Sequence, residues 1–264
     1  MTALPPLALG AAVAGAAFTA VWVASLRPRD VSLVDRFWGP GLALLAWVYV
    51  AACGVAGPRT VVVATLASLW GLRLGWHLHL RNRGHGEDRR YAAMRARSPR
   101  TFAWTSLVTV FGLQAALQWV VALPLWASAA HAAPLGAIDA LAVAVWAVGF
   151  AFETVGDAQL AAFRRDPTNR GRIMDRGLWA WTRHPNYFGD ACVWWAFGLF
   201  GVAAGGPPWT LAGPVVMTVL LAGVSGVPML EAGMRDRPGW AEYAARSSPF
   251  VPLPPRRARP PRVT

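Results

Sequence analysis

The chain has 264 residues, of which 55% are hydrophobic and only 14% are charged. A soluble domain carries about 25% charged residues, so this composition excludes an ordinary water-soluble globule. The net charge is nevertheless +12, and all 25 basic residues are arginine. An apolar but strongly basic chain is either a membrane protein with cationic loops or a nucleic-acid-binding protein, and the distribution of the arginines decides between them.

Seven apolar runs reach or approach the length of about 20 residues that a membrane-spanning helix needs. In chain order they are Leu7–Leu26, Phe37–Gly57, Thr60–Leu80, Phe102–Ser128, Leu135–Phe163, Pro185–Gly205 and Trp209–Leu230. The pattern predicts an all-α, polytopic membrane protein with about seven transmembrane helices in one bundle. We expect a single domain over residues 1–250 and a flexible tail rich in proline and arginine at 251–264.

The arginines alternate from one connection to the next. The first, third and fifth connections and the C-terminal segment hold 23 of them, whereas the connections on the other side hold only Arg59. This asymmetry is the positive-inside signal, and it predicts an N-terminus outside and a C-terminus in the cytoplasm. A nucleic-acid-binding protein would gather its arginines on one face of a soluble fold. We therefore expect a lipid bilayer as partner, and no nucleic acid.

Polar residues inside the third and fourth spans are candidates for function, because an ionisable group there costs about 2.5–3.5 kcal/mol on insertion scales. Trp70, Arg73 and His77 share one helical face. A structural alternative to a functional role is that the Arg73 side chain extends to the membrane–water interface or pairs with a carboxylate of another helix. Gln114 and Gln118 also share a face, and amide side chains at such positions usually join helices. We expect a structural role for these two glutamines.

The fifth span and the connection that follows it hold a second group of polar residues. Glu153 and Asp157 lie one turn apart, and two such carboxylates repel unless a cation or a ligand lies between them. The connection then brings a mixed basic and polar set: Arg164, Arg165, Arg170, Arg172, Arg183, His184, Asn169, Asn186 and Tyr187. Guanidinium groups match phosphate oxygens, so the sequence predicts a phosphate-bearing ligand on the cytoplasmic side. Topology or anionic lipid headgroups are the alternative explanation of these arginines.

The sequence lacks several familiar motifs. It has no GxGxxG after a strand, no GxxxxGK[ST], no HExxH and no paired CxxC. Cys53 and Cys192 lie inside apolar runs, so neither a disulfide nor a metal site is predicted. A nucleotide would have to be held by the membrane bundle itself.

Five segments carry a resemblance to a known family. They are Asp35, Trp38 and Gly39 in the pattern DxxWG, RNRGHGEDRRYAAMR at 81–95, ETVGDAQLAAF with GLWAWTRHPNYFGDACVWW, SGVPMLE, and AEYAARSSPFVP. Together they resemble the bacterial membrane proteins grouped with the steroid 5-alpha-reductase C-terminal domain. The resemblance covers residues 31–252, and its RHPNY core is shared with membrane methyltransferases.

The resemblance implies a helical bundle that binds NADPH from the cytosolic side and reduces a carbon–carbon double bond conjugated to a carbonyl in a steroid-like or other lipid. The cofactor-binding positions that it implies are Asn82, Arg83, Glu153, Asp157, Arg164, Arg172, Asn186, Asp190 and Trp194. The polar set of the fifth connection adds Arg183, His184 and Tyr187 to the expected cofactor site. The resemblance also implies the inner membrane of a bacterium as the location. Asp35 matches the region of the catalytic carboxylate. Steroid reductases polarise the carbonyl with a third-span tyrosine, where this chain has Gly71, so His77 or Tyr91 would replace it.

Two other functions stay open. RHPNY, Glu231 and AEYAARSSPFVP also resemble the C-terminal pattern of the isoprenylcysteine carboxyl methyltransferases, which would imply S-adenosylmethionine as cofactor. The missing third-span tyrosine equally allows a lipid-binding protein without catalysis.

Overall fold

The computed structural model describes residues 5–55 and 57–256, and within these ranges the regular structure is helical apart from one isolated β-bridge. Six helical segments are long and apolar enough to cross a membrane: Pro6–Leu26, Leu33–Cys53, Pro58–Asn82, Phe102–Val121, Ala137–Arg165 and Pro208–Ala232. The protein is therefore an all-α polytopic membrane protein, as the sequence predicts. The sixth predicted span is the 19-residue helix α10 (Pro185–Ala203), which is absent from this set because its first turns are polar.

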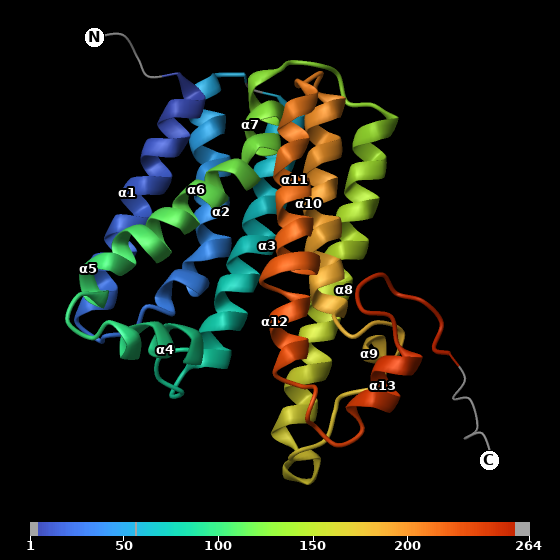
Figure 1. Cartoon of the computed structure of the whole chain (residues 1–264). Coiled ribbons are helices and arrows are strands. Elements are labelled where there is room, and N and C mark those ends of the chain that lie inside the picture. Colours follow the sequence, from blue (N-terminus) through green and yellow to red (C-terminus); the bar gives the residue numbers. More distant parts are fainter. Residues whose placement is uncertain (1–4, 56, 257–264) are drawn as a thin grey trace. The chain divides into compact units, whose positions relative to one another are not determined.

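The chain divides into two compact units, of which the first comprises the described part of residues 1–139 together with Phe197–Gly213. Its main helices are α1 (Pro6–Leu26), α2 (Leu33–Cys53), α3 (Pro58–Asn82), α4 (Arg89–Arg97), α5 (Phe102–Ser106), α6 (Leu113–Val121) and α7 (Leu123–Ala130) (Figure 1). A π-helical segment, Leu107–Gly112, joins α5 to α6, and a 3-10 turn, Pro208–Leu211, also belongs to this unit. The predicted fourth span thus breaks at Ala122, between α6 and α7.

Helices α2 and α3 pack backbone to backbone through a pair of glycines. A β-carbon on Gly39 would lie 2.4 Å from the Gly71 carbonyl oxygen, so only glycine permits this approach. Pro40 follows directly in α2, and proline cannot donate the backbone hydrogen bond that continues a helix. From α6, the Gln118 side chain donates to the carbonyl of Trp38 at 2.9 Å. The helix-joining role predicted for Gln118 is confirmed.

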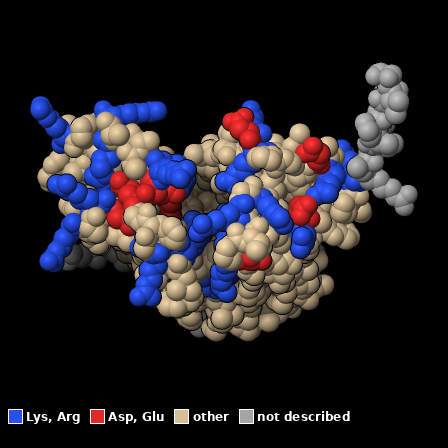
Figure 2. Space-filling view, turned by 90° about the horizontal axis from the view of Figure 1, so that it is seen from below, with Lys and Arg blue, Asp and Glu red and all other residues tan. Residues whose placement is uncertain are grey.

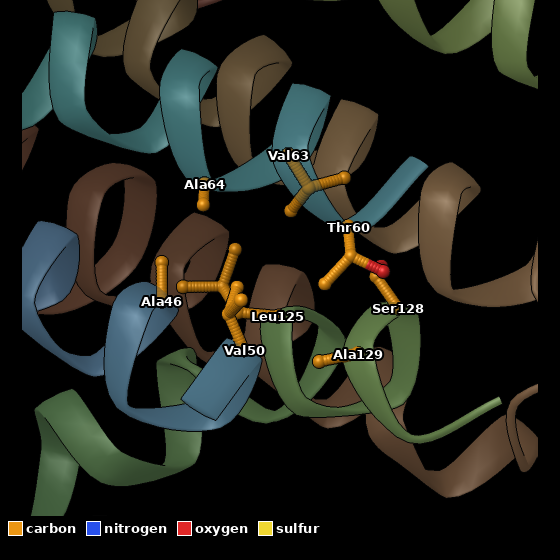
Figure 3. A pocket seen from close by; sticks show the side chains of 8 residues that line it. All are labelled: Ala46, Val50, Thr60, Val63, Ala64, Leu125, Ser128 and Ala129. Atoms are coloured by element: carbon orange, nitrogen blue, oxygen red, sulfur yellow. The ribbon is translucent and has the colours of Figure 1, made fainter. Parts of the chain in front are cut away.

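Nearer the C-terminal end of α2 and the N-terminal end of α3, these two helices and α7 enclose a small cavity. Figure 3 shows the eight side chains that line it: Ala46, Val50, Thr60, Val63, Ala64, Leu125, Ser128 and Ala129. The space between them is too small for a water molecule. It is a packing defect between apolar helices and not a ligand site.

A buried ion pair fastens the N-terminal end of α3 within this unit. The Arg59 guanidinium donates to both carboxylate oxygens of Asp139 at 2.7 and 2.8 Å, and to the carbonyls of Ala133 and Pro134. The side chains of Arg59 and Asp139 are only 4% and 7% exposed. Arg59, which the sequence places on the side poor in arginine, therefore has a structural partner.

The second unit comprises Ala140–Ala196 and the described part of residues 214–264. Its helices include most of α8 (Ala137–Arg165), the start of α10, α9 (Leu178–Trp181), α11 (Ala212–Val219), α12 (Val227–Ala232) and α13 (Trp240–Arg246), with a π-helical segment Leu220–Val224 between α11 and α12. Helices α8 and α10 approach closely at Gly149 and Gly189. A β-carbon on Gly189 would lie 2.4 Å from the Gly149 carbonyl oxygen and 2.5 Å from the Glu153 nitrogen.

The C-terminal segment of this unit returns to the connection between α8 and α10. The Arg183 N–H donates to the Ser248 carbonyl at 2.8 Å, and the Leu253 N–H donates to the Trp181 carbonyl at 3.1 Å. Thr182 and Ser248 form the isolated bridge. The first residues of the predicted tail are thus hydrogen-bonded, whereas 257–264 lie outside the described residues.

Candidate functional site

Two of the three predicted catalytic residues are in direct contact. The Tyr91 hydroxyl, on α4, donates to Asp35 Oδ1 in the first turn of α2 at 2.9 Å, although the residues are 56 positions apart in the chain. Arg90 donates to the other oxygen of Asp35 at 3.0 Å. Tyr91 is 6% exposed, whereas the Arg90 side chain is 45% exposed. The result is a phenol–carboxylate pair covered by a partly exposed arginine.

The segment before α4 holds this pair in place by binding the start of α2. Asp88 caps α4 by accepting from the Arg90 N–H, and its own N–H donates to the Ser32 hydroxyl at 2.7 Å. Glu87 accepts from the Val31 N–H at 2.9 Å and from Arg95 at 2.8 and 2.9 Å. These contacts fix α4 to the N-terminal end of α2. Figure 2 shows a face of the protein on which several acidic side chains form a group with basic side chains around it.

The electrostatics of the segment keep Tyr91 neutral and Glu87 charged. Burial, reinforced by the Asp35 carboxylate, raises the pKa of Tyr91 well above its usual value. The phenol therefore retains its proton at physiological pH and acts as a hydrogen-bond donor. Burial alone would raise the pKa of Glu87, but the hydrogen bonds from Arg95 and Val31 outweigh it and lower that pKa.

The other predicted residues of the first unit lie at the end of α3. His77 is half-buried on this helix, and α3 ends at Asn82. The Asn82 side chain accepts from Arg81 at 3.1 Å, and Arg83 is exposed just beyond the helix. Asn82 and Arg83 are therefore near the surface, unlike the buried Tyr91.

In the second unit, the acidic stripe of α8 faces the first turn of α10. The Asn186 side chain donates to Asp157 at 3.2 Å and accepts from the Tyr187 N–H at 3.1 Å. Asp157 and Glu153 are 6% and 2% exposed. The Gly149–Gly189 contact explains this arrangement, because it brings the backbones of the two helices together beside Glu153.

Arg183 and His184 form an internal cluster with Glu231. Arg183 donates to Glu231 at 2.7 Å and to the carbonyls of Ala244 and Ser247 at 3.0 and 2.7 Å. His184 lies 3.2 Å from Glu231 through Nε2. Burial lowers the pKa of His184 to about 4, so the ring is neutral and Nε2 is the donor. The hydrogen bonds of Arg183 thus tie the C-terminal segment to this loop.

The remaining predicted cofactor residues differ in exposure. Arg164 and Arg172 are exposed, Asp190 is half-buried, and Trp194 is fully buried on α10. In the described part of the chain, the side chains of Arg165, Arg170 and Arg172 make no hydrogen bond or ion pair. Exposed arginines therefore surround the end of α8, and Asp166 lies close enough to interact with one of them, Arg172.

Several residues of these clusters were not predicted as site residues, notably Glu87, Asp88, Arg90, Arg95, Arg59 and Asp139. The surplus of arginine masks those that are paired, because hydropathy and charge counts do not show which cations meet acids. A signal did exist for Arg59 and Asp139, which stand alone on the side otherwise free of charge. Across the described residues, no three side chains of His, Cys, Asp or Glu gather as metal ligands.

Comparison with known proteins gives a family. A family profile described as "Protein of unknown function (DUF1295)" matches residues 21–247. The uncharacterized protein C594.04c of Schizosaccharomyces pombe is 26% identical over 211 residues, which cover 70% of this chain and 61% of the yeast protein. The alignment thus spans less than two thirds of that relative, and no solved structure matches the chain. Because the profile covers most of its length, the chain belongs to the DUF1295 family.

Proposed function

We propose that the protein is a membrane reductase that uses NADPH to reduce a carbon–carbon double bond conjugated to a carbonyl in a steroid-like or other lipid. The observation that carries the proposal is the hydrogen bond between Tyr91 and Asp35. Tyr91 would supply the phenol that steroid reductases have in their third span. At that position this chain has Gly71.

The chemistry of a phenol–carboxylate pair suits the reduction of an enone. Negative charge develops on the carbonyl oxygen when a hydride reaches the β-carbon, and one well-placed donor stabilises it by about 2.7–4 kcal/mol. Tyr91 keeps its proton, because burial raises its pKa. The phenol O–H, which Asp35 accepts in this structure, would turn to the carbonyl oxygen and donate to it. Asp35 would then take up a proton from solvent and pass it to the phenol oxygen. Arg90, which donates a hydrogen bond to the other oxygen of Asp35, would stabilise the ionised form of that carboxylate.

The residues of the second unit fit part of a dinucleotide. Exposed Arg172 makes no side-chain hydrogen bond or ion pair with a described residue and is suited to phosphate oxygens. Arg164 is exposed in the last turn of α8. Asp157 and Asn186 offer paired acceptors and donors for hydroxyl or amide groups. When bound, reduced nicotinamide supplies a hydride. Arg183 and His184 do not fit a ligand-binding role, because Glu231 and backbone carbonyls take up their hydrogen bonds.

The direct test is NADPH binding and oxidation by the full chain in nanodiscs, with a panel of enone lipids. Arg172→Ala and Asn186→Ala should weaken NADPH binding about tenfold each, as expected for lost charge-assisted hydrogen bonds. Arg235→Ala is the matched control, since Arg235 is an exposed arginine of the same unit outside the site. Tyr91→Phe should leave NADPH binding intact and lower kcat about a hundredfold or more.

The methyltransferase alternative has one observation in its favour. Arg183 and His184 of RHPNY do meet Glu231, so the residues that resemble the methyltransferases are together in space. Binding of S-adenosylmethionine without binding of NADPH would replace the reductase proposal by this one. Binding of neither cofactor would favour a non-catalytic lipid-binding protein.

A further inference from the structure

Four exposed arginines of the first unit have no role in the contacts described above. We term them the arginine corner: Arg27, Arg29, Arg97 and Arg100. None of their side chains makes a hydrogen bond or ion pair with a described residue. The acids nearby are already paired, since Asp30 binds Arg36, Glu87 binds Arg95, and Asp88 binds Arg90. The positive charge of the corner is therefore not neutralised within this part of the chain.

Three segments are held together to form the corner. Trp22, near the end of α1, donates to the Ala103 carbonyl of α5 at 2.8 Å, and its ring lies 5.4 Å from that of Trp104. Arg95 donates to the Arg29 carbonyl at 3.3 Å and covers the Phe102 ring at 4.9 Å. The turn after α1, the end of α4 and the start of α5 are thus one continuous patch.

The backbone at Arg29 is strained. Its φ is +54°, and among the described residues it is the one non-glycine residue with a positive φ. A β-carbon is disfavoured in this left-handed region, which glycine or asparagine adopts more easily. Backbone strain of this kind is found preferentially at ligand-binding and switch sites, and here it coincides with an exposed guanidinium group.

The corner lies where a span meets the membrane surface. Helix α1 and the segment starting at α5 are both candidate spans, and the corner stands at the end of one and the beginning of the other. Trp104 is 70% exposed in the first turn of its span, and tryptophan is enriched where spans meet the lipid headgroups. The four guanidinium groups are therefore at the depth of headgroup phosphates and not out in bulk solvent.

We propose that the arginine corner binds the phosphate of an anionic phospholipid headgroup. Guanidinium groups bind phosphate oxygens through paired hydrogen bonds. An anionic lipid adds net charge that a zwitterionic lipid lacks, and each basic residue near such a surface strengthens binding about fivefold. The site is separate from the proposed reductase residues, and its existence does not depend on that function.

The test uses the full chain in phosphatidylcholine vesicles that contain a minor fraction of spin-labelled phosphatidylglycerol. A variant with glutamine at all four corner positions should lose at least about tenfold of its preference for phosphatidylglycerol. The control places glutamine at Arg176, Arg235, Arg237 and Arg256, which are exposed, belong to the other unit and change the net charge equally. An equal loss in both variants, or no loss in either, would overturn the proposal.

Arg29→Gly separates binding from folding. It removes the guanidinium group and relieves the strained φ, so Tm should stay equal or rise while the preference for phosphatidylglycerol falls about fivefold. An unchanged preference would contradict a ligand-binding role for Arg29. A competition with inorganic phosphate at constant ionic strength identifies the source of the phosphate. Weak competition supports the lipid, whereas displacement as effective as that by phosphatidylglycerol contradicts it.

Discussion

Buried ionic contacts show what single residues contribute to this protein. Arg59 and Asp139 are both almost fully buried and satisfy each other through two hydrogen bonds. Removal of one partner from a buried pair leaves an uncompensated charge, whereas replacement of both by apolar residues is often tolerated. We therefore expect replacement of either residue alone to lower the stability of the protein more than replacement of both residues together.

Arg59→Ala should lower the free energy of unfolding by about 3–5 kcal/mol, because it leaves the Asp139 carboxylate buried without its partner. The double variant Arg59→Met with Asp139→Leu should recover a large part of that loss. Denaturant titration in detergent micelles measures both. A double variant as unstable as the single one would show that packing, and not the charge pair, determines stability at this point.

His184 makes stability depend on pH. Its pKa in the folded protein is about 4, against an unperturbed value of 6.5, because the ring is buried. The unfolded chain therefore takes up the proton first, and stability is lost as pH falls from 6.5 towards 4. The loss approaches about 3 kcal/mol at most, from the size of the shift.

This loss can be measured by unfolding the protein in detergent at a series of pH values. His184→Gln, which keeps a hydrogen-bond donor for Glu231, should flatten the slope between pH 6.5 and 4 relative to the unsubstituted chain. An identical slope in the variant would assign the effect to other titrating groups.

At the scale of elements, glycine contacts determine how closely helices pack. Gly189→Ala places a β-carbon against the Gly149 carbonyl and the Glu153 nitrogen, so α8 and α10 must separate. We expect a loss of about 1–3 kcal/mol in stability, as for other overpacked sites. The Asn186–Asp157 contact should weaken as well, and with it the affinity for NADPH under the proposed function.

Gly15→Ala is the matched control, because Gly15 lies in helix α1 and its β-carbon would meet nothing within 4 Å. Alanine there should stabilise the protein by up to about 1 kcal/mol, since it restricts the unfolded chain. Unfolding curves of the two variants should thus shift in opposite directions. Equal shifts would mean that helix propensity alone, without the close contact, explains the effect at Gly189.

The sequence predicts the helices well, and their internal breaks poorly. Apolar length identifies each span, because it sums hydropathy over about 20 residues. The same sum cannot detect the π-helical segment at Leu107–Gly112 or the break at Ala122, which concern hydrogen-bond register. The family resemblance led to Asp35 and Tyr91 separately. Their contact depends on how the loop before α4 folds onto α2, which no local pattern encodes.

At the scale of the whole molecule, one contact bears on the number of spans. The loop before α10 is hydrogen-bonded to the C-terminal segment, at Arg183 with Ser248 and at Leu253 with Trp181. Two segments in contact lie on the same side of a membrane, so the chain between them must cross an even number of times. The span Pro208–Ala232 provides one crossing. Helix α10, although more polar at its start, must therefore provide the other.

This argument predicts a topology that cysteine labelling can test in intact cells. Ala132→Cys and Pro208→Cys should react with a membrane-impermeant thiol reagent. An even number of crossings separates each of these positions from the N-terminus, which is expected outside. Arg170→Cys and Arg237→Cys should react only after permeabilisation, because the positive-inside signal assigns their loops to the cytoplasm. The native Cys53 and Cys192, both half-buried, are replaced first. If Arg170→Cys and Arg237→Cys reacted from opposite sides, α10 would not cross the membrane, and the count of seven spans would be wrong. If both reacted from outside, the count would stand and the orientation would be reversed.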